Sequence, residues 1–197
     1  MSVIEIDGLT KDYGNQKGLF DVSFTIEKGE ILGFLGPNGS GKTTLIRHLM
    51  GFIKPDQGSV SIMNLDCFAQ SPKIQEMVGY LPGEIAFMDE MRGIDFIKFI
   101  AEMKKIKDLS RAKELIDFLE LDPTNKIKRM SKGMKQKIGL VIAFMQDCPI
   151  LILDEPTSGL DPLMQNKFVE LIKRAKAEGR TVLMSSHIFE EIENTCD

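Results

Sequence analysis

This 197-residue sequence is poor in cysteine and in long apolar runs. Its three cysteines, Cys67, Cys148 and Cys196, are far apart and show no Cys-x-x-Cys spacing, so we expect reduced, mostly buried thiols without a disulfide framework or a zinc site. The longest stretch without a charged residue, Ile31 to Gly41, has 11 residues, whereas a membrane-spanning helix needs about 20 predominantly apolar residues. The sequence therefore predicts no transmembrane segment.

Basic clusters and a secretory signal are also missing. Lys and Arg total 25 against 29 Asp and Glu, a net charge of −4, and no basic run is dense enough for a nucleic-acid-binding arm. The first residues, Met1 to Asp7, have neither the basic region nor the apolar stretch of a signal peptide. We expect a cytoplasmic protein that does not bind nucleic acid. Its 43% hydrophobic content is enough for the core of one compact domain.

The first part of the chain shows strand patterns and then a helix. Apolar and polar residues alternate at 3–7 and 22–26, and a buried apolar run follows at 31–35. A glycine-rich turn then leads into a helix that begins near Lys42. These patterns predict a small antiparallel sheet near the N-terminus and the start of an α/β core.

The second half of the chain is expected to be helical at first and then to alternate between strand and helix. Residues 84–149 repeat apolar side chains at helical spacing and are expected to be almost wholly helical. Strands are expected at 150–154 and 181–185, on either side of a helix that Asp161 can cap, with Pro162 at its first position. We predict a single α/β domain whose core, 1–83 and 150–197, has a mostly parallel sheet and carries the inserted helical part.

A glycine-rich segment follows the strand expected at 31–35. Lys42 would supply a cation for the β and γ phosphates of ATP, Thr43 a hydroxyl for Mg²⁺, and Thr44 a contact to the α-phosphate. Glycines let successive backbone N–H groups converge on phosphate oxygens, and the following helix adds the positive end of its dipole. The alternative is a glycine-rich turn with a solvated lysine. The segment matches the phosphate-loop pattern G-x-x-x-x-G-K-[ST] with Gly36, Pro37, Asn38, Gly39, Ser40, Gly41, Lys42 and Thr43.

Two carboxylates, Asp154 and Glu155, end the apolar strand expected at 150–154. The C-terminal edge of a parallel sheet is where ligands bind. Neighbouring strand residues face different ways, so Asp154 can hold Mg²⁺ while Glu155 orients or deprotonates the attacking water. The alternative is a strand that merely ends in charged surface residues. Together with the phosphate loop, the pair predicts nucleotide hydrolysis.

A polar segment at 130–137 precedes an apolar helix about 20 residues before the acidic strand. Its Ser131 is a good N-cap, and the exposed N–H groups at the start of a helix attract anions, although a plain helix cap is the alternative. The chain thus has, in order, a phosphate loop, a helical insertion, a Ser-x-Gly segment, an acidic strand, Ser158 to Asp161, and Ser185 to His187. This order covers nearly the whole chain and resembles the ABC transporter ATPases.

The resemblance implies roles for further residues. In that family the Ser-x-Gly segment reads L-S-G-G-Q and binds the γ-phosphate of ATP held by the opposite subunit, which assigns this role to Ser131 and Gly133. Tyr13 lies where an aromatic ring stacks on adenine, a contact worth about 1–3 kcal/mol, against the alternative of a half-exposed structural tyrosine. His187 takes the place of the histidine that contacts the γ-phosphate, and Asp161 belongs to the loop that meets the partner. We therefore expect a head-to-tail homodimer with ATP between the subunits.

Several positions depart from the family pattern. Where the family has a Mg²⁺-binding glutamine, this chain has Glu84, which is either a substitute oxygen ligand or a solvated surface residue. Lys132 and Met134 replace a glycine and the last glutamine of L-S-G-G-Q. Two segments, Leu-Pro-Gly-Glu at 81–84 and Ser-Lys-Gly-Met-Lys-Gln at 131–136, together resemble the subgroup that works with ABC-2-type export permeases. The chain stops at Asp197, where such domains continue with further strands, so we expect a truncated domain.

The resemblance implies the ATP-hydrolysing subunit of a bacterial exporter, peripheral on the inner face of the cell membrane and attached to transmembrane permease subunits. Chromosome-maintenance ATPases of this class carry long coiled coils, but the insertion from Glu84 to Arg129 has only 46 residues. Translation factors of this class need two ATPase domains, and a module that binds ATP without hydrolysis would not need Glu155 and His187. Phe87 and Met88 are expected either to receive a permease helix or to pack under their loop.

Overall fold

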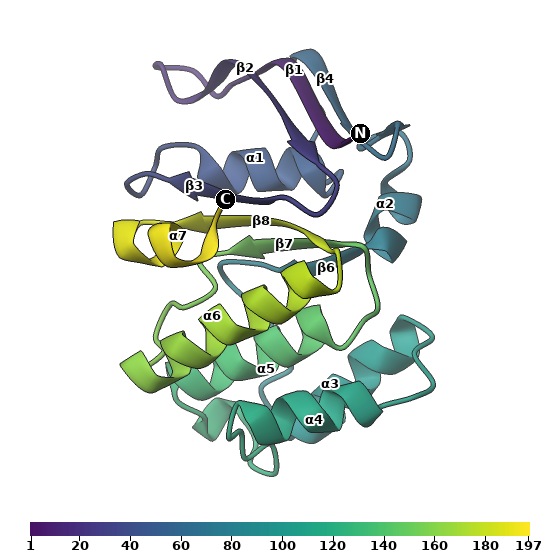
Figure 1. Ribbon diagram of the computed structural model, residues 1–197, viewed down its shortest axis with the longest axis vertical. Helices are drawn as coiled ribbons and strands as arrows, with labels where there is room; N and C mark the ends of the chain where they lie inside the picture. Colours follow the sequence, from purple (N-terminus) through teal and green to yellow (C-terminus); the bar gives the residue numbers. More distant parts are fainter.

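The computed structural model describes the backbone of residues 1–197 and every side chain except those at 191 and 194. Figure 1 shows its elements in layers: an antiparallel sheet, helix α1 (Lys42–Leu49) beneath it, a parallel sheet, and then the remaining long helices. One apolar core lies between the two sheets around α1, and a second lies between the parallel sheet and the helices below it. The predicted α/β class is confirmed.

The antiparallel sheet has the strand order β2-β1-β4-β5. Its strands are β1 (Ser2–Asp12), β2 (Gly18–Glu27), β4 (Gln57–Ile62) and β5 (Leu65–Asp66). The alternation at 3–7 covers the first half of β1 and that at 22–26 the second half of β2, so neither strand was predicted over its full length. Because one face packs on α1, apolar side chains alternate with polar ones along these strands. The most deeply buried residues, each at most 3% exposed, are Ile4, Ile6, Leu9, Ile26, Val60 and Ile62.

The parallel sheet has the order β3-β8-β7-β6. It consists of β3 (Ile31–Leu35), β8 (Thr181–Ser186), β7 (Ile150–Asp154) and β6 (Val78–Leu81). Both central strands, β7 and β8, are buried along their whole length, which explains the unbroken apolar runs at 150–153 of β7 and 182–184 of β8. The predicted strand at 150–154 coincides with β7. Since all four strands are parallel, their carboxyl ends meet at one edge.

Helices cover the second face of the parallel sheet. In Figure 1, α6 (Pro162–Ala177) and α5 (Lys132–Phe144) lie directly below it, with α3 (Gly93–Met103) and α4 (Ser110–Phe118) farther away. Residues 84–149 contain α3, α4, the 3-10 turn Ile127–Arg129 and α5, so loops interrupt what we expected to be almost wholly helical. Because α5 packs on β6 as well as on α3 and α4, it joins the helical part to the core.

Both expected helix caps are present. The Ser131 hydroxyl accepts a hydrogen bond from the backbone N–H of Met134 at 3.2 Å, at the start of α5. The Asp161 carboxylate accepts one from Met164 at 3.0 Å, and Pro162 is the first residue of α6. Each cap satisfies a backbone donor that has no partner within its helix.

Several short elements were not predicted by the sequence analysis: β4, β5, α2 (Ser71–Met77) and α7 (Phe189–Thr195). Each has at most 7 residues and lacks both a continuous apolar run and a long hydrophobic period. Cys67 and Cys148 are buried as expected, and Cys196 is partly buried. Among the described residues, no helix combines the length and apolar character needed to cross a membrane.

Candidate functional site

A pocket of about 660 Å³ opens at the carboxyl edge of the parallel sheet. Its floor is the loop between β3 and α1, and its walls come from the β1–β2 turn and from the residues that follow β6 and β7. The structure thus brings together segments that are widely separated in sequence. The lining residues are 37–44, Tyr13, Lys17, Gly18, Arg47, Tyr80, Pro82, Gly83, Glu84, Asp154 and Glu155.

The phosphate loop needs its glycines for local reasons. Gly39 and Gly41 have φ angles of 86° and 96°, a left-handed conformation that residues with a β-carbon avoid. A β-carbon at Gly36 would lie 2.7 Å from Ser40 Oγ, too close for an unshifted loop. Gly41 is also the N-cap of α1, so the chain turns into the helix with its N–H groups facing the pocket edge.

Lys42 is the first residue of α1 and is only 10% exposed. Its ammonium donates to the carbonyl of Gly36 and, at 3.2 Å, to that of Pro37. Its Nζ also lies 3.4 Å from Oε1 of Glu155. The cation of the loop and the second carboxylate of the acidic pair therefore face each other across the pocket floor.

Asp154 ends β7 and is 1% exposed. Thr43 Oγ1 donates to its Oδ2 at 2.9 Å, and the Ser185 hydroxyl donates to its Oδ1. Among the described residues, no group of three or more His, Cys, Asp or Glu side chains is placed to hold a metal ion. A hydroxyl and one carboxylate are the hard oxygen donors that fit Mg²⁺ when nucleotide phosphates and water supply its other ligands.

Glu155 follows β7 in an unusual backbone conformation, with φ at 49°. Its N–H donates to Ser185 Oγ at 3.0 Å, and its Oε2 lies 2.6 Å from Nδ1 of His187. His187 follows β8, so the parallel pairing of β7 and β8 brings the two side chains together. The sequence analysis named Ser185 only as the start of the segment that ends in His187 and gave it no role, yet its single hydroxyl contacts both residues of the acidic pair.

Ser131 and Gly133, predicted to bind the γ-phosphate of a partner's ATP, lie at the start of α5. Neither is among the described residues that line the pocket. A β-carbon at Gly133 would lie 2.8 Å from the carbonyl oxygen of Gly159, so this glycine is needed for close contact between α5 and the loop after β7. Lys132 Nζ donates to Ser158 Oγ at 2.8 Å in the same contact.

Residues around the pocket mouth include several that the sequence analysis did not name. Tyr13, which the family resemblance did name, is 54% exposed. Beside it is Lys17, and Arg47 lies on α1 one turn after Thr44; neither was named from the sequence. The helical spacing from Thr44 could have identified Arg47, whereas no motif marks Lys17. Tyr80, whose pKa is raised to about 12 by burial, keeps a neutral phenol in the pocket wall.

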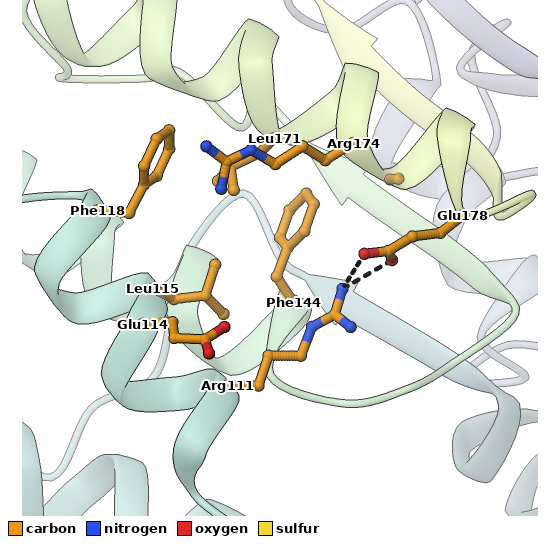
Figure 2. A pocket seen from close by; sticks show the side chains of 9 residues that line it. Arg111, Glu114, Leu115, Phe118, Phe144, Leu171, Arg174 and Glu178 are labelled. Carbon is orange, nitrogen blue, oxygen red and sulfur yellow. Dashed lines mark hydrogen bonds and ion pairs between the residues drawn. The ribbon is translucent and has the colours of Figure 1, made fainter.

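A smaller hollow of about 130 Å³ lies between α4 and α6, and Figure 2 shows its lining side chains. Arg111 is bound by both carboxylate oxygens of Glu178, at 2.8 and 3.1 Å, and Arg174 lies 4.4 Å from the centre of the Phe118 ring. Because these cations already have partners, this hollow offers no comparable phosphate site. The pocket at the sheet edge is the candidate nucleotide site.

The fold and this pocket together define a phosphate-loop nucleotide-binding domain. Comparison with known families agrees, because the family model described as "ABC transporter" matches residues 19–158. The chain belongs to the ABC transporter family and carries its ATP-binding domain.

Curated relatives come from the same family. The chain is 39% identical over 199 residues to the uncharacterized ABC transporter ATP-binding protein YdbJ of Bacillus subtilis (strain 168), covering 99% of this chain and 64% of that protein. It is 36% identical over 191 residues to the ABC transporter ATP-binding protein NatA of the same organism, covering 92% of this chain and 76% of that protein. The chain therefore spans less than two thirds of YdbJ.

Solved structures show the same fold. A structure of the ATP-binding subunit of an ABC transporter superposes with a TM-score of 0.88 at 30% identity, covering 100% of this chain and 84% of that one. The dimeric structure of MJ0796, a bacterial ABC transporter cassette, gives a TM-score of 0.86 at 23% identity, covering 98% and 91% of the two chains.

Proposed function

We propose that this chain hydrolyses ATP to power a membrane transporter. The observation that carries the proposal is the cluster of Lys42, Glu155 and His187 beside the phosphate loop, with 3.4 Å between Lys42 and Glu155 and 2.6 Å between Glu155 and His187. A module that only binds nucleotide has no need for a carboxylate held against a histidine at this point. Hydrolysis needs such a group, because water must be positioned and lose a proton.

ATP would lie with its phosphates over residues 37–44, where backbone N–H groups and the Lys42 ammonium offset their charge. Thr44 would contact the α-phosphate. Tyr13, half exposed at the pocket mouth, would stack on adenine. The pocket volume of about 660 Å³ is within the range of small-molecule sites.

Thr43 and Asp154 would hold Mg²⁺, since their oxygens already lie 2.9 Å apart. The bound ion would offset charge on the β and γ phosphates. Glu84 lies at the rim of the same pocket, next to Gly83, whose β-carbon position is 3.1 Å from Asp154 Oδ2. A carboxylate there is near enough to the acidic strand to remain a candidate additional ligand.

Glu155 would orient the attacking water and accept its proton, and His187 would hold the water and the γ-phosphate from the opposite side. The backbone of Glu155 is fixed by Ser185 and its carboxylate by His187, so the base is held in place before the nucleotide arrives. In this arrangement the Lys42 ammonium turns from Glu155 and the loop carbonyls towards the phosphates when ATP binds.

We place the second half of each site on another copy of the chain. Ser131 and Gly133 lie at the start of α5 and outside the pocket, so they are available to the γ-phosphate of ATP bound by a partner. The MJ0796 cassette, which has this fold, is dimeric, and another of its structures is a post-hydrolysis state bound to ADP and Pi. A head-to-tail homodimer with two shared sites is the assembly we propose.

The transmembrane permease would dock beside the nucleotide pocket, where a groove of about 340 Å³ is lined by Glu84, Ile85, Phe87 and Lys135. Phe87 packs against Phe96 at 5.3 Å between ring centres, which favours the packing interpretation for this side chain. Met88 is 48% exposed and free to contact a permease helix. Docking there puts the chain at the cytoplasmic face of the membrane.

We also propose an exporter. The Leu-Pro-Gly-Glu and Ser-Lys-Gly-Met-Lys-Gln segments support pairing with ABC-2-type permeases. LnrL of Bacillus subtilis (strain 168), named a linearmycin resistance ATP-binding protein, is 32% identical over 99% of this chain, which spans 64% of that protein. Resistance by pumping a compound out of the cell is compatible with export.

Phosphate release from ATP and Mg²⁺ by the purified chain tests the proposal. The parent should turn over ATP, and Glu155→Gln, which keeps the shape but removes the base, should lower the rate at least about 100-fold while ATP still binds. Glu102→Gln, the same change on the exposed side of α3, is the matched control and should match the parent. ATP binding without phosphate release by the parent would instead support the non-hydrolysing module.

A further inference from the structure

A buried glutamine of α5 contacts the backbone of the acidic segment. Gln136 is 6% exposed, and its Nε2 donates to the carbonyl oxygen of Glu155 at 3.2 Å and to that of Pro156 at 2.8 Å. Both amide hydrogens are thus used on consecutive carbonyls just after β7. An amide buried in this way is satisfied only while that turn keeps its present shape.

The turn needs such support. Glu155 has φ at 49°, a strained conformation for a residue with a β-carbon, and it persists only where surrounding contacts hold it. Its N–H is bound by Ser185 and its carbonyl by Gln136, so the peptide units on both sides of the strained residue are anchored. Releasing one anchor lets the backbone relax, and the carboxylate then moves relative to His187 and Lys42.

We propose that Gln136 is a positioning residue for Glu155, an inference that rests on the proposed ATPase function. It acts through the Glu155 backbone and does not touch the nucleotide pocket. Because α5 begins at Lys132, beside Ser131, the helix that carries the half-site for the partner's ATP also holds the base of its own chain. The contact of Gly133 with Gly159 ties the same two segments together a second time.

The test replaces Gln136 by methionine, which has similar length and no donor. Gln136→Met should lower kcat at least about tenfold and leave the KM for ATP within about twofold, because only the base is displaced. In a Glu155→Gln background, the same substitution should leave the residual single-turnover rate unchanged. A rate loss of equal size in both backgrounds would show that Gln136 acts without Glu155 and would overturn the inference.

Gln146→Met is the matched control. Gln146 is 7% exposed, lies just past the other end of α5, and has an Nε2 without a hydrogen-bond partner, so its amide donors hold no turn. This variant should lose stability in thermal unfolding but keep the parental turnover per folded molecule. If Gln136→Met does not fold, Gln136→Asn, which draws the amide back from both carbonyls, should still lower kcat, and parental turnover in it would contradict the proposal.

A second readout is independent of catalysis. The chain has two histidines, so the ring signals of His187 and His48 can be followed separately by NMR. In Gln136→Met, the His187 signals should shift towards those of Glu155→Gln, and those of buried His48 should stay in place. Unchanged His187 signals in a folded variant would overturn the inference even if the parent released no phosphate, whereas failure of the proposed function would appear only as absent turnover in the parent.

Discussion

Glu155 combines a strained backbone with contacts to four other residues. Ser185 binds its N–H, Gln136 its carbonyl, and His187 and Lys42 lie at its two carboxylate oxygens. Strain of this kind persists only where surrounding contacts overdetermine the conformation, and it is concentrated at functional sites. The arrangement therefore favours a fixed carboxylate over a mobile one.

The sequence revealed part of this cluster. Lys42 and Glu155 belong to patterns with a physical meaning, a phosphate loop and the end of a buried strand, and His187 came from the family resemblance. Ser185 and Gln136 lie in segments that the sequence analysis quoted, but their roles could not be found in the same way. Their roles depend on the register of β7 with β8 and on the side of α5 that meets the next loop, which only the assembled fold defines.

At the same scale, Lys42→Ala should weaken ATP binding at least about tenfold, because charge-assisted hydrogen bonds contribute about 1.5–3 kcal/mol each. The dissociation constant of a fluorescent ATP analogue, with Mg²⁺ present, measures the effect. Lys54→Ala is the control, since Lys54 is exposed and outside the pocket. Affinity in Lys42→Ala equal to that of the parent would show that the phosphate-loop assignment is wrong.

Among the elements, those with a clear local pattern in the sequence were predicted well, and those without one were not. β7 was predicted with its observed bounds because a fully buried strand is a continuous apolar run ended by charge. The start of helix α6 at Pro162 was also predicted, because a helix cap depends only on residues that are neighbours in the sequence. The loops within 84–149 were missed because apolar residues continue through them; Ile106 and Leu109, between α3 and α4, pack on the core.

The attachment of α4 to the core is also an element-scale property. Figure 2 shows Arg111 of α4 paired with Glu178, close to the buried ring of Phe144 on α5. Phe144→Ala should lower the free energy of unfolding by about 3–5 kcal/mol, because it leaves a cavity in the core. Arg111→Ala should cost less than about 1 kcal/mol, since its side chain is 35% exposed and Glu178 is 42% exposed.

Urea denaturation followed by circular dichroism measures both variants. The expected ranking reflects apolar packing as the main attachment of α4, with the ion pair contributing little. An Arg111→Ala variant as unstable as Phe144→Ala would show instead that the salt bridge dominates.

For the whole molecule, the separation of two predicted half-sites matters most. The phosphate loop lies at the carboxyl edge of the parallel sheet, and Ser131 caps helix α5 outside the pocket that this loop lines. The residues indicated both segments and their order, and the family resemblance implied that they are separated; neither gave the position of α5 against the sheet on which the separation depends. If the proposed roles are right, one chain supplies halves of two different sites, and hydrolysis should need two chains.

Coupling between the halves follows from the same geometry. In each chain, α5 contacts the loop that carries Glu155 through Gln136 and through Gly133. Under the proposed function, a nucleotide bound only in the closed dimer would stabilise that state by mass action, and opening after hydrolysis would act on the attached membrane subunits.

Size-exclusion chromatography of Glu155→Gln with ATP and Mg²⁺ tests the shared-site account most directly. Because this variant should bind ATP and hydrolyse it very slowly, the closed dimer should accumulate with ATP and return to monomer with ADP. The parent and Glu102→Gln should remain largely monomeric under the same conditions, since they consume the ATP. A soundly folded Glu155→Gln variant that hydrolyses ATP at the parental rate as a monomer would contradict both the catalytic assignment and the shared site.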